Sequence, residues 1–83
     1  MEGESTAVKA YILLSTSNGD TEEMAQTLRK QPGVKLVDIL EEPYGAIMLI
    51  EASERQKLAD LTVQALAAVQ SLTSDIKLLM TRD

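Results

Sequence analysis

Carboxylates are the main side chains that could do acid–base chemistry in this 83-residue chain, because the sequence contains neither histidine nor cysteine. Glu41 and Glu42 are adjacent in a segment with the composition of a strand. Neighbouring residues of a strand point to opposite faces, so these two carboxylates cannot work together as general acid and general base. The usual acids, bases and nucleophiles are therefore missing, and we expect no enzymatic turnover, no metal site and no cofactor.

Two other polar stretches have structural explanations. Asp20, Glu22 and Glu23 occur where a helix is expected to begin, and the helix dipole favours negative charge there. The Ser-Asn-Gly-Asp stretch at 17–20 lacks the glycine density and the following Lys-Ser or Lys-Thr of a phosphate-binding loop. We therefore expect no nucleotide site in this region.

Composition restricts the partners that this chain can bind. Thirteen acidic residues against eight basic ones give a formal charge of −5, which disfavours direct binding to nucleic acid or to an anionic membrane. No apolar run approaches the roughly 20 residues of a membrane span, and the polar, acidic N-terminus is unlike a signal peptide. We expect a flexible stretch at 1–6 and a single soluble, cytoplasmic domain at 7–83.

The elements that must position any site follow from the spacing of apolar residues. Strands are expected at 7–16, 34–42, 46–51 and about 69–81, with one helix between the first two strands and another between the last two. Gln-Pro-Gly at 31–33 should end the first helix. Pro43, Tyr44 and Gly45 should form the turn between the second and third strands, and a purely structural role explains this turn well.

Both helix starts have the spacing of a capping box, in which two side chains satisfy free backbone amides of the first turn. Asp20 is followed three residues later by Glu23, and Ser53 is followed in the same way by Gln56. We therefore expect the first helix to begin after Asp20 and the second after Ser53.

The order β-α-β-β-α-β predicts an α+β, ferredoxin-like fold, with a four-stranded antiparallel sheet in the order 4-1-3-2 and both helices on one face. The first and third strands are apolar at successive positions, as expected of central strands. Tyr11, Leu13, Ile47 and Leu49 would then lie on the face that no helix covers. A second copy of the sheet is the simplest cover, so we predict a homodimer that buries these four residues.

The stretch from about residue 7 to residue 80 resembles the effector-binding domain of the Lrp/AsnC family of transcription regulators, also called the RAM domain. The resemblance rests on a helix that ends in QPGV (31–34), a hairpin turn about ten residues later, a helix opened by ASERQKLADL (52–61), and LAAVQSLTSDIKLLM (66–80). It implies a stand-alone version without the helix-turn-helix. It also implies dimers, often octamers, that bind amino acids between dimers, and a DNA-binding paralogue as a further partner.

The same resemblance implies an effector site near the hairpin. Its residues here would be Glu42, Tyr44, Gly45 and Ala46, with Ser74 from the last strand. Where the family has a glycine and, after two residues, an aspartate, this chain has Glu42 and Gly45, and the family's Thr-x-Thr is replaced by residues that include Ser74. The alternative is a purely structural oligomerisation domain, or an ACT-like protein-interaction module without a small ligand.

Overall fold

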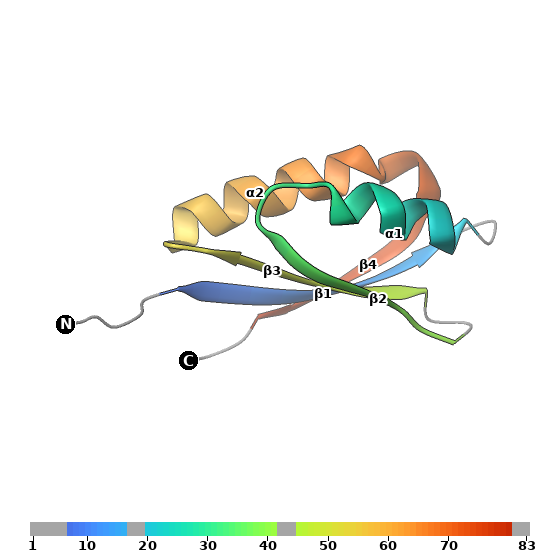
Figure 1. Cartoon of the computed structure of the whole chain (residues 1–83), viewed down its shortest axis with the longest axis horizontal. Coiled ribbons are helices and arrows are strands. Elements are labelled where there is room, and N and C mark those ends of the chain that lie inside the picture. The colour runs from blue at the N-terminus through green and yellow to red at the C-terminus, as the bar shows by residue number, and fades with distance from the viewer. Residues whose placement is uncertain (1–6, 17–19, 42–44, 81–83) are drawn as a thin grey trace.

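The computed structural model describes residues 7–16, 20–41 and 45–80. Its elements, drawn in Figure 1, are β1 (Val8–Thr16), α1 (Thr21–Arg29), β2 (Val34–Ile39), β3 (Ala46–Ala52), α2 (Arg55–Ala68), a 3-10 turn (Gln70–Leu72) and β4 (Thr73–Met80). The stretch 1–6, expected to be flexible, lies outside the described residues. Neither helix of the described part is long and apolar enough to cross a membrane.

The strands form one antiparallel sheet in the order β2-β3-β1-β4. Both helices lie on one face of this sheet, and the opposite face carries no element of the described chain (Figure 1). The ferredoxin-like architecture expected from the sequence is thus confirmed. The central strands are β1 and β3, the two segments with apolar residues at successive positions.

The core lies between the helices and one face of the sheet. Alternate residues of the central strands point into it, and they are fully or almost fully buried: Ala10, Ile12 and Leu14 in β1, and Ala46, Met48 and Ile50 in β3. The helices contribute the residues of their apolar faces: Met24, Ala25 and Leu28 from α1, and Leu58 and Ala65 from α2. Burying one such aliphatic side chain stabilises the fold by roughly 1.5–3 kcal/mol.

The two expected capping boxes do not form in the structure. Asp20 precedes α1 as expected, but its side chain makes no capping hydrogen bond, because its backbone (φ −86°, ψ 33°) is not extended as this contact requires. The prediction for the second helix was wrong in position: α2 begins at Arg55, and Glu54 rather than Ser53 is the residue before its first turn. Leu58 and Ala65 are the buried residues by which α2 packs against the core.

Two strands are shorter, by three or more residues, than the sequence predicted. The second ends at Ile39 rather than at residue 42. The last begins at Thr73 rather than at 69, because Val69, the residue after α2, is fully buried in the core one helical turn beyond Ala65. Thr73 Oγ1 donates a hydrogen bond to the Val69 carbonyl oxygen (2.7 Å), which fixes the change from helix to strand.

Candidate functional site

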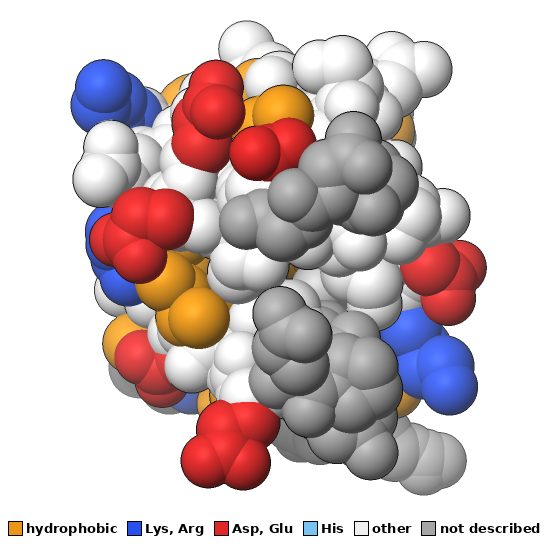
Figure 2. All heavy atoms as spheres, turned by 90° about the vertical axis from the view of Figure 1, so that its right-hand side faces the viewer, with side chains coloured by type: hydrophobic (Ala, Val, Ile, Leu, Met, Phe, Trp, Pro, Cys, Tyr) orange, Lys and Arg blue, Asp and Glu red, His pale blue; other side chains and the backbone are white. Residues whose placement is uncertain are grey.

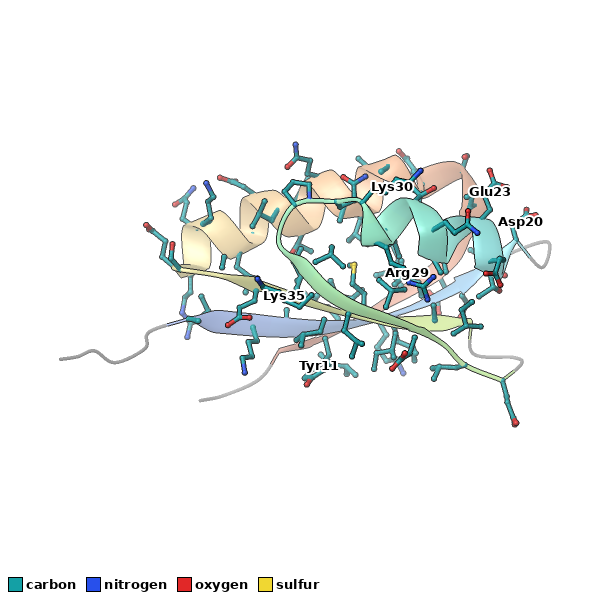
Figure 3. The ribbon with its side chains drawn as sticks, viewed as in Figure 1. Tyr11, Asp20, Glu23, Arg29, Lys30 and Lys35 are labelled. Atoms are coloured by element: carbon teal, nitrogen blue, oxygen red, sulfur yellow. The ribbon has the colours of Figure 1, made fainter. Side chains whose placement is uncertain are left out.

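The uncovered face of the sheet brings together the four residues that the sequence placed there. In the register of the two central strands, Tyr11 pairs with Leu49, and Leu13 pairs with Ile47. Each of the four side chains is only partly buried. Tyr11 points away from the helices (Figure 3). The face is therefore apolar where β1 and β3 meet.

The edge strands extend this apolar surface with two residues that the sequence analysis did not single out. Leu36 of β2 pairs with Leu49, and Leu79 of β4 pairs with Tyr11. Leu36 is 45% exposed and Leu79 is 44% exposed, which is high for large aliphatic side chains. One apolar row, Leu36–Leu49–Tyr11–Leu79, thus crosses all the strands of the sheet. In the sequence, the alternation of apolar and polar residues within each edge strand was the one feature that pointed to Leu36 and Leu79. The register then shows that these two residues align with Leu49 and Tyr11.

The next row on the same face has charges at its two ends. Asp38 of β2 pairs with Ile47, and Lys77 of β4 pairs with Leu13. Both charged residues are exposed. Together the two rows form an apolar centre with an acid at one edge of the sheet and a base at the other. We call these eight residues the open-face patch: Leu36, Asp38, Ile47, Leu49, Tyr11, Leu13, Lys77 and Leu79.

The expected effector site falls partly outside the described residues. Glu42 and Tyr44 belong to the part of the chain that the structure does not describe. Ala46 is fully buried on the helix side of the sheet, so its side chain lies in the core. The sequence placed Ile47 and Leu49 on the uncovered face, and strand alternation then puts Ala46 on the helix side, as the structure shows.

Gly45 has a structural role that the geometry explains. Its φ of +89° lies in the region that residues with a side chain rarely adopt. A Cβ atom at this position would overlap the Leu14 carbonyl oxygen and lie 3.0 Å from the Cα of Ser15. The Gly45 carbonyl oxygen accepts a hydrogen bond from the Leu40 amide (2.7 Å), which joins the two sides of the hairpin.

Ser74 lies at the same end of the sheet as Gly45. Its hydroxyl donates a hydrogen bond to the Ser15 carbonyl oxygen (3.3 Å), and the Cα of Ser15 also neighbours Gly45. One strand, β1, therefore separates these two candidate residues. Figure 2 looks onto this end of the molecule, where acidic side chains are spread over the surface and basic ones lie toward its margins. Among the described residues, no group of three potential ligands could hold a metal ion.

Comparison with known proteins adds evidence on the fold. No family model and no curated protein matches the sequence. Among solved structures, FFRP-DM1 has a TM-score of 0.78 at 20% identity, and the match covers 90% of this chain and 99% of that one. The transcriptional regulator NMB0573 of Neisseria meningitidis, solved with L-Met, has a TM-score of 0.69 at 17% identity over 92% of this chain and 50% of that one.

A third similar structure belongs to a chaperone and not to a transcription regulator. The Tat proofreading chaperone NapD of E. coli has a TM-score of 0.70 at 15% identity, and the match covers 98% of this chain and 83% of that one. The present chain spans about half the length of some of the similar structures, the methionine-bound regulator among them. At these identities the comparisons establish the ferredoxin-like fold.

Proposed function

We propose that this chain is a non-enzymatic regulatory domain of the Lrp/AsnC effector type, which forms a homodimer through the open-face patch. The observation that carries this proposal is the apolar row Leu36–Leu49–Tyr11–Leu79, because it crosses all four strands on the uncovered side of a small sheet. A soluble protein rarely leaves such a surface in water, and a second sheet packed face to face covers it.

The charges at the patch edges favour one arrangement of the two copies. A twofold axis parallel to the strands, between β1 and β3, places β2 of each protomer opposite β4 of its partner. Asp38 then faces the partner's Lys77, and symmetry generates the same pair again. Leu36 faces the partner's Leu79 in the same way. The patch is thus complementary to itself in this orientation.

A charge exchange tests this orientation. Asp38→Lys places two bases opposite each other on both sides of the axis. We expect the dimer to weaken by about two- to thirtyfold, because two exposed ion pairs are lost and each contributes roughly 0.2–1 kcal/mol. Lys77→Asp should weaken it similarly. The double variant Asp38→Lys with Lys77→Asp restores both pairs, so its dimer dissociation constant, measured by sedimentation equilibrium, should return close to that of the unmodified chain.

The control is the salt dependence of the same constants. Both single variants should differ most from the parent at low ionic strength, since salt screens exposed charges. If the double variant dissociates as readily as the single ones, the axis does not run parallel to the strands and this orientation is incorrect.

The effector that we propose is an amino acid bound at the sheet end that carries Gly45 and Ser74. Its ammonium would pair with the carboxylate of Glu42, and backbone amides near Gly45 would receive its carboxylate. Two observations support this choice of ligand: the many acidic side chains at this end (Figure 2), and the similarity in fold to a regulator solved with L-Met. Further assembly into octamers, and pairing with a DNA-binding paralogue, follow from the same family resemblance.

Calorimetric titration of the dimer with single amino acids tests the effector site. Glu42→Gln removes the negative charge and keeps the size of the side chain. We expect any amino acid that binds the parent to bind this variant about tenfold more weakly, because the variant loses the free energy of one partly exposed charged hydrogen bond. Glu41→Gln, one residue away, is the matched control and should bind normally. Equal affinity of the Glu42→Gln variant and the parent would remove Glu42 from the site.

A second candidate function is a protein-interaction module without a small ligand. The observation that favours it is the similarity to a proofreading chaperone over almost the whole chain. Thermal unfolding in the presence of each amino acid separates the two candidates. A raised melting temperature with one of them supports the sensor, since a ligand that binds only the folded state stabilises it. No shift with any amino acid supports the interaction module.

A further inference from the structure

The helix layer leaves strand β4 uncovered. On one side, α1 packs against β2, and Arg29 Nη2 donates a hydrogen bond to the Val37 carbonyl oxygen (3.0 Å). On the other side, α2 packs over β3 and β1. The layer is therefore displaced toward β2. Ile76 and Leu78 of β4 face the helix side but remain 43% and 51% exposed, whereas their partners in β1 are fully buried.

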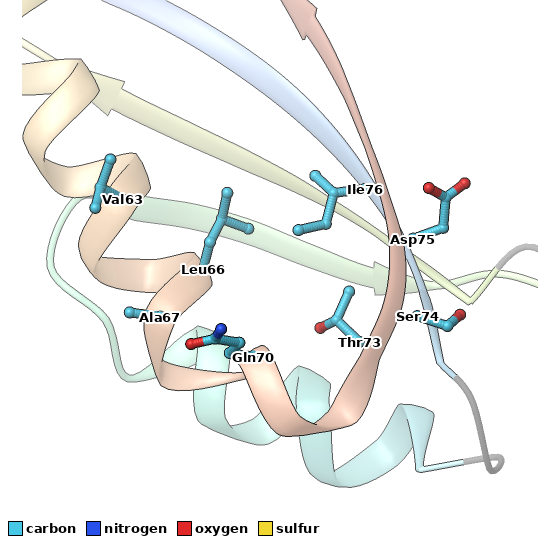
Figure 4. Close-up of a pocket in the computed structure, with 8 residues that line it drawn as sticks. All are labelled: Val63, Leu66, Ala67, Gln70, Thr73, Ser74, Asp75 and Ile76. Carbon is cyan, nitrogen blue, oxygen red and sulfur yellow. The ribbon is translucent and has the colours of Figure 1, made fainter.

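A groove runs between α2 and β4 as a result. Two hollows of about 490 Å³ and 360 Å³ lie along it, and both are lined by Val63 of α2, which is 67% exposed. In the first hollow, Leu66 of α2 and Ile76 of β4 point toward each other, whereas Ser74 and Asp75 project from the other side of the strand (Figure 4). The side chains that point into this α2–β4 groove are thus mostly apolar.

The two ends of the groove differ in chemistry. Arg55, in the first turn of α2, lines the second hollow together with Leu78. Gln70 lines the first hollow beyond the other end of α2. The 14 residues of α2 span about 20 Å, so an apolar path of roughly that length joins a cationic end at Arg55 to an end lined by Gln70 and Asp75.

The small uncovered area limits which kind of molecule can bind in the groove. Only one strand is uncovered, and neighbouring strands are about 4.8 Å apart. An α-helix is about 10–12 Å wide with its side chains and would need a broader shelf. A single alkyl chain needs only the exposed face of one strand, and the cation at one end favours a ligand whose terminal group is negatively charged.

We propose that the α2–β4 groove binds a linear aliphatic carboxylate, with the alkyl chain over Val63, Ile76 and Leu78 and the carboxylate at Arg55. This site goes beyond the proposed function: it lies on the helix side of the sheet and uses none of the residues of the open-face patch or of the hairpin. Ser74, a candidate of the effector site, also lines the first hollow, but Val63 and Arg55 belong to neither the effector site nor the open-face patch, so variants of these two residues test the groove separately.

Calorimetric titration of the full chain with decanoate, laurate and myristate, each below its micelle concentration, tests the site. Affinity should rise about two- to fourfold for each added methylene, because each is removed from water in the groove. Val63→Asp should reduce laurate affinity at least tenfold, because it places a carboxylate beside the alkyl chain. Val63 is exposed, so this variant should still fold. Gln64→Asp, the next residue and outside the groove, carries the same charge change and should bind laurate normally.

The position of the carboxylate is tested by Arg55→Gln. We expect about tenfold weaker binding of decanoate and unchanged binding of 1-decanol, which has no charge. The proposal is overturned if no fatty acid binds saturably, if affinity does not depend on chain length, if Gln64→Asp weakens binding as much as Val63→Asp, or if Arg55→Gln affects the acid and the alcohol equally. Self-association that Val63→Asp abolishes without any lipid would assign the groove to a second copy of the chain and would also overturn it.

Discussion

Replacing Leu13 by aspartate should convert the dimer into a folded monomer. Leu13 lies in the open-face patch between Ile47 of β3 and Lys77 of β4, and the neighbouring row of the patch is apolar on all the strands. A carboxylate buried there against the second sheet costs several kcal/mol, which the neighbouring Lys77 offsets only in part, and symmetry introduces two such carboxylates. Dimer affinity should therefore fall by at least about a hundredfold. Light scattering at increasing protein concentration measures the change.

The monomer should keep its fold, because the Leu13 side chain lies outside the core between the helices and the sheet. Circular dichroism checks this directly. Gln64→Asp provides the matched control, because it adds the same charge on the exposed helix side. The mass that light scattering measures for this variant should remain that of the unmodified dimer. A Leu13→Asp variant that stays folded with an unchanged mass would show that the uncovered face is not the interface.

Replacing Gly45 by alanine should destabilise the protein by about 3 kcal/mol or more, the range expected when backbone strain and a steric overlap combine. The added Cβ would overlap the Leu14 carbonyl oxygen, which is part of the sheet and cannot move independently. For a domain of this size, total stability is only about 5 kcal/mol. Urea denaturation should therefore show most of the free energy of unfolding lost.

Gly33→Ala separates the steric overlap from the backbone strain. Gly33 also has a positive φ (+85°), but the nearest atom to its added Cβ is the Leu61 Cδ1, at the end of a flexible side chain. We expect a loss of about 1–2 kcal/mol there. Equal losses at the two glycines would mean that strain alone matters. A Gly45→Ala variant with normal stability and weaker effector binding would mean that this glycine serves the ligand and not the turn.

The edge strands β2 and β4 show what the alternation of apolar residues in a sequence cannot predict. The alternation in β2 and β4 indicates which residues share a face, but the alignment of Leu36 with Leu79, or of Asp38 with Lys77, depends on the register of three strand pairs. Register is a property of pairing between distant segments, which no local pattern contains. The dimer residues named from the sequence were therefore confined to the central strands.

The hairpin shows a second limit. Composition identified a turn near Gly45, and the positive φ explains why glycine stands there. The proposed role of Glu42 and Tyr44 rests on family resemblance and stays a prediction, since both lie outside the described residues. The burial of Ala46 agrees with the alternation that puts Ile47 and Leu49 on the uncovered face, so the resemblance named a residue whose side chain lies in the core.

The amino-acid sequence by itself determined the order of the elements, the ferredoxin-like topology and the identity of the central strands, because each follows from local apolar spacing and from general rules of chain connection. The tertiary structure decided where α2 begins, that Val69 extends its core face, and that the helix layer is displaced toward β2 and exposes Ile76 and Leu78. These features depend on how whole layers pack to fill the core, and packing of residues far apart in sequence overrides capping signals that contribute only about 1 kcal/mol each.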